Sequence, residues 1–199
     1  MGQEIACVAQ FSGKRGQGKV LLETKEIIFR GDFRLKIPFS SIREVKTANG
    51  ELRLKTPEGV AVFEIGPKAE TWRDKILNPK SLVQKLGIKA GETVTMRGAF
   101  SREFRESLKK HGAKIGTSSS PPWILFAAET SGELKVVKSI ARSLQGAAAL
   151  WIVFPKGQKT ITEHDVRGAG LKAGLTDVKV ASFSETNTAL KFVIPKANR

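Results

Sequence analysis

The spacing of apolar residues changes once along the chain. Between residues 18 and 65, apolar and polar positions alternate in short runs separated by Gly, Asn and Pro, which is typical of antiparallel strands joined by tight turns. The pair Asn49-Gly50 lies between two such runs and predicts a two-residue hairpin, because both residues tolerate positive φ angles. Residues 67–77 then adopt helical spacing, with Trp72 on the apolar face and Asn78-Pro79 as the stop signal.

From residue 90 onward the pattern alternates between strand-like and helix-like segments. Two runs, residues 123–128 and 148–154, are apolar without alternation, as expected of central strands that are covered on both faces. Shorter strands are predicted at 93–96, 113–117, 178–183 and 190–195, and helices at 101–110, 134–144 and 162–173. This alternation predicts a mostly parallel sheet with helices on both faces.

The two patterns predict two domains with different folds. Residues 1–80 are expected to form an α+β domain, a curved antiparallel sheet closed by one C-terminal helix. Residues 90–199 are expected to form a three-layer α/β domain. Residues 81–89 are interpreted as the linker between the two domains.

The first domain resembles the pleckstrin-homology-like (PH-like) and GRAM-like superfamily. The resemblance is carried by LLETKEIIFRG, by IPFSSIREV at residues 37–45, and by the terminal amphipathic helix with Trp72. It implies a PH-like barrel with a C-terminal helix. Because some members of this superfamily bind phosphoinositides, it also makes an anionic membrane surface one partner to test.

The second domain resembles a truncated class I (Rossmann-like) methyltransferase. The resemblance is carried by QG and LWI-x-x-PK within residues 145–156, by a helix ending in AGL at residues 173–175, and by the final antiparallel pair. More closely, LGIKAGE, LWIVFPKG, GLTDVKV and LKFVIPK are similar to a small bacterial family catalogued only as a domain of unknown function. These resemblances imply a minimal methyltransferase-like fold and no particular reaction.

The residues that would hold a methyltransferase cofactor do not follow this resemblance. S-adenosylmethionine needs a glycine-rich turn after the first strand and an acidic residue after the next strand, where the ribose hydroxyls bind. Here the first strand ends at Arg97-Gly98 with a lone glycine, and residues 113–122 contain no carboxylate. The sequence therefore predicts a methyltransferase-like domain without a cofactor.

The charge of the chain favours anionic partners. It has 34 Lys and Arg residues against 19 Asp and Glu residues, a formal net charge of +15 that is spread along both domains. Such a charge attracts phosphate-rich polymers at low salt, and it is equally expected of a surface that only keeps the protein in solution. Since the few aromatic residues fall mostly within apolar runs, base stacking is disfavoured, and we expect loose contact with nucleic acid or with an acidic protein.

The cellular compartment is predicted from what the sequence lacks. No apolar run approaches the roughly 18 residues of a membrane-spanning helix, and the N-terminal residues do not follow the pattern of a secretory signal. The single cysteine, Cys7, cannot form an internal disulfide. These features together predict a protein of the reducing cytoplasm.

No catalytic or metal-binding residues are predicted. His111 and His164 lie far apart and in no spacing with Cys or carboxylates that would supply three or four metal ligands. His164 instead falls within a helix start, where Thr162 and Asp165 form a capping pair. A nucleophile elbow of the G-x-S-x-G type is also missing from the sequence.

Basic residues supply the two candidate anion sites. The first is the carboxyl edge of the predicted parallel sheet, where ligands bind in open α/β folds; Arg97 and Gly98 follow one strand there, and Lys156 and Lys159 follow another. These residues are interpreted either as one anion site or as cations that are solvated separately.

The second candidate is the glycine-rich segment SGKRGQGK, which contains Lys14, Arg15 and Lys19. It is not a P-loop, because Val20 stands where that motif needs a hydroxyl. The segment is therefore interpreted either as a phosphate-binding loop or as a flexible basic lead-in to the first strand.

The sequence favours a non-enzymatic binding or scaffold module for an anionic partner, either nucleic acid or an acidic protein. One alternative is an enzyme, namely a methyltransferase with an atypical cofactor site or an enzyme that binds a phosphorylated small molecule beside Lys156. Another alternative is an adaptor at a membrane surface, acting through the first domain.

Overall fold

The computed structural model describes residues 3–198 and consists of two compact units. The boundary between them in the sequence falls between Lys80 and Ser81. Each unit has its own sheet and its own apolar core. Within residues 3–198, no helix has both the length and the apolar character needed to cross a membrane.

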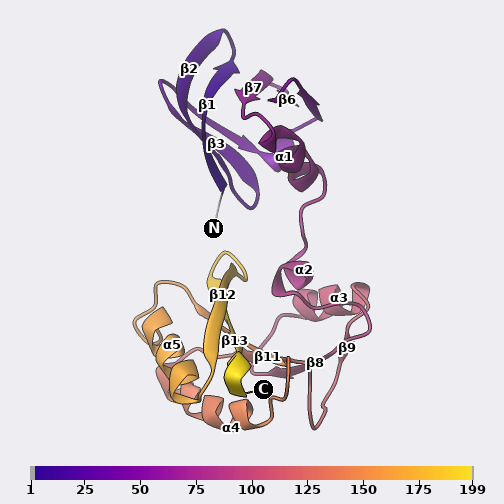
Figure 1. The fold of residues 1–199 in the computed structure, drawn as a ribbon, viewed down its shortest axis with the longest axis vertical. Coiled ribbons are helices and arrows are strands. Elements are labelled where there is room, and N and C mark those ends of the chain that lie inside the picture. The colour runs from indigo at the N-terminus through magenta and orange to yellow at the C-terminus, as the bar shows by residue number, and fades with distance from the viewer. Residues whose placement is uncertain (1–2, 199) are drawn as a thin grey trace. The chain divides into compact units, whose positions relative to one another are not determined.

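The first unit is one antiparallel sheet of seven strands followed by a helix (Figure 1). Its elements are β1 (Gln3–Phe11), β2 (Lys14–Leu22), β3 (Glu26–Gly31), β4 (Arg34–Pro38), a short 3-10 helix (Phe39–Ser41), β5 (Glu44–Ala48), β6 (Glu51–Thr56), β7 (Gly59–Glu64) and α1 (Lys68–Leu77). The strand order is β4-β3-β2-β1-β7-β6-β5. The prediction of a loop or flexible lead-in for residues 12–19 is wrong, because β2 already begins at Lys14.

The predicted hairpin at Asn49-Gly50 is confirmed. Asn49 and Gly50 have φ angles of 51° and 78°, and Ala48 pairs with Glu51 across the turn. The predicted helix after residue 67 is also confirmed as α1, which packs against β5 and β6. Its residue Trp72 is fully buried in the core, which explains the apolar face that the sequence showed.

The second unit contains a mixed sheet of six strands with helices on both faces. Its elements are α2 (Leu82–Leu86), β8 (Thr93–Arg97), α3 (Arg102–Lys110), β9 (Lys114–Ile115), β10 (Trp123–Ala127), a 3-10 helix (Ser131–Val136), α4 (Val137–Arg142), β11 (Ala149–Pro155), α5 (Glu163–Lys172), β12 (Thr176–Ser182), β13 (Asn187–Val193) and a last 3-10 helix (Lys196–Asn198). The strand order is β12-β13-β11-β10-β8-β9.

Two apolar clusters lie on opposite faces of this sheet. Alternate residues of β11 enter different clusters: Leu150 and Ile152 lie among residues of α4 and α5, while Trp151 lies among residues of α2 and α3. The prediction that both unalternated apolar runs are central strands is confirmed, because β10 and β11 are adjacent and parallel.

The segment interpreted as a linker has structure of its own. Ser81 caps α2 through a capping box with Gln84, and Gly87 ends the helix with a φ of 85°. The backbone oxygen of Leu86 accepts a hydrogen bond of 3.0 Å from the buried indole nitrogen of Trp151. Val83, Leu86 and Ile88 of this segment are therefore part of the core of the second unit.

The expected architecture, a PH-like barrel followed by a three-layer Rossmann-like domain, is wrong. In the first unit the seven-stranded sheet is open, because β4 and β5 form its two edges and are not hydrogen-bonded to each other. In the second unit β13 runs antiparallel between β11 and β12, and β9 reaches β10 through residues 116–122 without a crossover helix. The chain is mainly β structure in two sheets of different kinds.

The reason for this error is that periodicity reports burial and not hydrogen-bond partners. A strand with one apolar face has the same pattern at an open edge as in a closed barrel. Likewise, a run that is buried on both faces does not reveal whether its next neighbour is parallel or antiparallel.

The thiol of Cys7 is predicted to be unreactive in the folded chain. Burial raises the pKa of this thiol to about 11, so that only about 0.1% would be thiolate at pH 8. Labelling by a disulfide reagent at pH 8 should be slow for the native protein and fast in denaturant. Equal rates in both conditions would contradict the burial of this side chain.

The two glycines of α5 are predicted to respond in opposite ways to alanine. A Cβ at Gly170 would lie 2.1 Å from the fully buried ring of Phe192, whereas a Cβ at Gly168 would meet no atom within 4 Å. Gly170→Ala should lower the free energy of unfolding by about 1–3 kcal/mol, and Gly168→Ala should raise it by about 0.5–1 kcal/mol. Urea unfolding followed by circular dichroism measures both, and equal effects would contradict the packing of α5 on β13.

Candidate functional site

The second unit has one topological switch point in its sheet. β9 pairs with one side of β8, and β10 pairs with its other side. The connection after β8 therefore leads toward one edge of the sheet, and the connection after β10 leads toward the opposite edge. Ligands of open α/β sheets bind in the crevice outside the carboxyl ends of such strands. Arg97 ends β8 and Gly98 follows it, so two of the predicted site residues lie at this position.

Gly98 is required here by the fold itself. Its φ angle is 87°, and a Cβ would lie 2.4 Å from the backbone oxygen of Ala127 at the end of β10. A side chain at this position would force the two strand ends apart. The glycine thus permits close packing of β8 against β10, which is independent of any ligand.

Arg97 is the available cation at the switch point. Its side chain is exposed, and no hydrogen bond or ion pair with another residue in the range 3–198 engages its guanidinium. The following residues lead directly into α3, where Ser101 accepts a hydrogen bond of 3.2 Å from the amide of Phe104. Ser101 therefore caps the start of α3.

Lys156 has a different environment from Arg97. Its ammonium donates hydrogen bonds to the hydroxyl oxygen of Ser182 at 3.0 Å and to the backbone oxygens of Ser184 at 2.6 Å and Glu185 at 3.3 Å. Its amide also donates to the backbone oxygen of Thr186 at 2.7 Å. Lys156 therefore connects the end of β11 to the turn between β12 and β13 through these hydrogen bonds.

The sheet register separates Arg97 from Lys156. Arg97 is opposite Phe126, which is opposite Ile152, and Lys156 lies four residues beyond Ile152. With standard strand spacing and rise, their Cα atoms are roughly 16 Å apart. Lys159 is exposed on the loop that follows β11. The structure thus places all these cations along one edge but does not gather them around one point.

Three phenylalanine rings meet near the switch point. Phe183, in the turn after β12, lies 4.8 Å from Phe104 and 6.0 Å from Phe100 between ring centroids, and Phe100 lies 5.7 Å from Phe104. Phe104 is buried, while Phe100 and Phe183 are partly exposed. Sequence reasoning missed this cluster because its members are far apart in the chain and each falls beside an element boundary.

The residues at this edge do not fit S-adenosylmethionine. Gly98 is a single glycine pressed against Ala127, so it does not form a glycine-rich cradle. The segment after β9, residues 116–122, contains no carboxylate that could accept hydrogen bonds from the ribose hydroxyls.

The candidate cations of the first unit are mostly paired. Arg15 lies 2.9 Å from Glu64, and Lys19 lies 2.7 Å from Glu4, in ion pairs that are exposed to solvent. Lys14 is exposed at the start of β2. These residues lie on a strand of the sheet, so they do not form a phosphate-binding loop of the kind considered for this segment.

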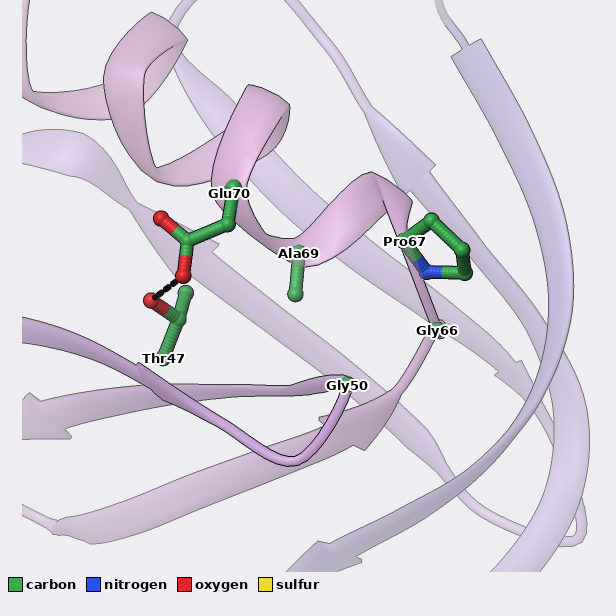
Figure 2. Close-up of a pocket in the computed structure, with 6 residues that line it drawn as sticks. All are labelled: Thr47, Gly50, Gly66, Pro67, Ala69 and Glu70. Carbon is green, nitrogen blue, oxygen red and sulfur yellow. Dashed lines mark hydrogen bonds between the residues drawn. The ribbon is translucent and has the colours of Figure 1, made fainter.

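A hollow of about 350 Å³ lies beside the start of α1 in the first unit (Figure 2). Its polar groups already have partners: Glu70 accepts a hydrogen bond of 2.5 Å from Thr47, and its other oxygen lies 2.6 Å from Arg73. The rest of its lining is Gly50, Gly66, Pro67 and Ala69. Its two polar side chains, Thr47 and Glu70, are therefore engaged in contacts within the unit.

Metal binding finds no support in the described residues. No cluster of three or more His, Cys, Asp or Glu side chains within residues 3–198 is placed to hold a metal ion. The ring of His111 instead lies at hydrogen-bond distance, 3.1 Å, from the backbone oxygen of Ile88. The predicted capping role of Thr162 and Asp165 is confirmed, because the two residues form a capping box at the start of α5.

One further lysine has an unusual environment. The ammonium of Lys191 lies 4.6 Å from the centre of the Trp123 ring. Partial burial, and then the nearby charge of Lys179, lower the pKa of Lys191. The Trp123 indole nitrogen donates a hydrogen bond of 2.6 Å to Glu92. These contacts stabilise the start of β10.

Comparison with known proteins gives likenesses of structure only. No family model and no curated protein sequence matches the chain. Among solved structures, a methyltransferase from Aquifex aeolicus that depends on S-adenosylmethionine has 15% identity and a TM-score of 0.46, covering 61% of this chain and 93% of its own. A TehB-like methyltransferase from Corynebacterium glutamicum, with the same cofactor dependence, has 14% identity and a TM-score of 0.43, covering 64% and 96%.

A third similar structure is the C-terminal domain of an unknown protein from Leishmania infantum. It has 9% identity and a TM-score of 0.33, and the match covers 38% of this chain and 78% of that one. The structural neighbours therefore include methyltransferases that use S-adenosylmethionine. Likenesses at this level do not transfer a reaction or a ligand to this chain.

Lys156→Met is predicted to loosen the turn between β12 and β13. The substitution keeps the length of the side chain but removes the donor of three hydrogen bonds to residues 182–185. Hydrogen exchange measured by mass spectrometry should become several-fold faster over residues 182–187. Lys159→Met removes an exposed cation from the loop after β11, which also contains Lys156, and should leave the exchange of residues 182–187 unchanged. Equal effects of the two substitutions would contradict the role of the Lys156 hydrogen bonds in stabilising this turn.

Proposed function

We propose that the second unit binds a small anionic ligand at the carboxyl ends of β8 and β10, with Arg97 as its charged contact. The observation that carries this proposal is the switch point between these strands, with Arg97 as the last residue of β8. A crevice forms at such points because the two connections leave the sheet in opposite directions.

The chemistry of the edge supports an anion with an apolar part. An arginine can bind a phosphate or carboxylate through two parallel hydrogen bonds, and the guanidinium of Arg97 forms no hydrogen bond or ion pair with the described residues. Phe100 and Phe183 add partly exposed rings to the same edge. This proposal narrows the anionic partner, which the sequence left as nucleic acid or an acidic protein, to a small molecule.

The alternative is a methyltransferase with an atypical cofactor site. It is favoured by the passage from β8 through Gly98 into α3, since a strand, a glycine turn and a helix in this order also form the first half of a cofactor-binding sheet. It has to account for the missing carboxylate after β9, which would leave the ribose without its usual acceptor.

Isothermal titration of the full chain with adenosine monophosphate tests the proposal. Adenosine monophosphate presents a phosphate and a planar apolar group, which match Arg97 and the phenylalanine rings. Arg97→Gln should weaken its binding about tenfold, because it removes a charge-assisted contact. Arg142→Gln, which removes an equally exposed cation on α4, should leave the affinity unchanged.

The outcomes separate the proposal from its alternative. Equal affinities of the two variants, or no binding by the native chain, would overturn the anion site. Titration with S-adenosylmethionine and its demethylated product tests the methyltransferase. Binding of either compound at micromolar concentration, without binding of adenosine monophosphate, would favour the enzyme.

A further inference from the structure

The outer face of the first unit carries three cations in one row. Lys19 on β2 is directly opposite Arg30 on β3, and Arg30 is directly opposite Arg34 on β4. Residues that face each other in antiparallel strands project to the same side, with Cβ atoms about 5 Å apart. All three side chains are exposed, while their neighbours Val20 and Phe29 point into the core.

A row of three positive charges destabilises the folded sheet unless carboxylates or a bound anion neutralise it. Like charges directly opposite each other destabilise a strand pair. The same sheet contains a second pair of this kind, Lys46 opposite Arg53, and there both cations are neutralised. Lys46 lies 2.8 Å from Glu44, and Arg53 lies 2.6 Å from Glu51, in each case the residue two positions earlier on the same strand.

Arg30 and Arg34 have no such carboxylates. Neither guanidinium forms an ion pair or a hydrogen bond with another side chain in the range 3–198, whereas Lys19 is paired with Glu4. The nearest acidic residue in sequence, Asp32, directs one carboxylate oxygen to the amide of Gln17 at 2.8 Å. In the next row Lys36 is paired with Glu26 at 3.0 Å. The repulsion between Arg30 and Arg34 is therefore not compensated by any ion pair of theirs among residues 3–80.

We propose that Arg30 and Arg34 together bind a phosphate group on the outer face of β3 and β4. Two guanidinium groups on adjacent strands can each direct a pair of N–H donors at one tetrahedral dianion. The bound charge replaces the repulsion with attraction, and Lys19 extends the positive row on one side. The phosphate belongs either to a soluble phosphorylated compound or to a lipid headgroup. This site is in the first unit and is independent of the one proposed at Arg97.

Titration of the full chain with inorganic pyrophosphate at low salt tests the site. Arg30→Gln/Arg34→Gln should weaken binding at least about tenfold. The matched control, Lys46→Gln/Arg53→Gln, removes the same charge from a like-charged pair of the same sheet and should keep the native affinity. The single variant Arg34→Gln should show an intermediate affinity, and circular dichroism checks that every variant is folded.

A second measurement separates a built site from general charge attraction. Without any phosphate, Arg30→Gln/Arg34→Gln should unfold at a higher temperature than the native chain at low salt, because it removes the repulsion. The control should unfold at the same or a lower temperature, because it removes two ion pairs. Pyrophosphate should then raise the unfolding temperature of the native chain and of the control, and not that of the arginine variant.

Sedimentation with vesicles identifies the source of the phosphate. Binding to phosphatidylcholine vesicles that contain phosphatidic acid, lost in the arginine variant and kept in the control, would assign a lipid headgroup. Binding of pyrophosphate alone with the same dependence would assign a soluble compound. The proposal is overturned if neither probe binds, or if the arginine variant and the control lose binding equally.

Discussion

The second unit depends on the burial of β11 on both of its faces. Its residues alternate between two apolar clusters, and the strands on either side are β10 and β13. Apolar burial contributes about 25 cal/mol per Å². A strand that buries the side chains of both faces therefore contributes more stabilisation per residue than a strand that buries one face. The only polar side-chain atom in the strand, the indole nitrogen of Trp151, donates to Leu86. Through this bond α2 becomes part of the same core.

The high positive charge of the chain is used in more than one way. Some cations stabilise the fold: Lys156 binds three oxygens of a turn, and Lys179 donates a hydrogen bond of 2.6 Å to the backbone of Lys85. Others are neutralised by carboxylates on the same strand, as Lys46 is by Glu44. Only the cations that have neither role, such as Arg97, Arg30 and Arg34, are available to a ligand. Net charge alone could not make this distinction, because it counts all of these residues equally.

Local features were predictable from the sequence, and pairings between distant segments were not. The Asn49-Gly50 turn, the capping pair of Thr162 and Asp165, and the burial of residues 123–128 and 148–154 each depend on a few consecutive residues, so their patterns identified them. The openness of the first sheet and the antiparallel insertion of β13 depend on which strands meet, and periodicity does not record this. At the candidate site the sequence found Arg97 and Lys156 but could not show that the ammonium of Lys156 already has three acceptors. It also could not bring Phe100, Phe104 and Phe183 together.

The contact between Gly98 and Ala127 has a consequence for the comparison of related sequences. A glycine after the first strand is commonly taken as a mark of nucleotide binding, yet here any side chain would collide with the neighbouring strand. Relatives with this strand arrangement would therefore keep the glycine even after losing every ligand. The residue that would vary with binding is the one before it, Arg97, whose guanidinium forms no hydrogen bond or ion pair within residues 3–198. In an alignment, the residue at position 97 would then indicate whether the ligand is bound, and the glycine at position 98 would indicate only the strand arrangement.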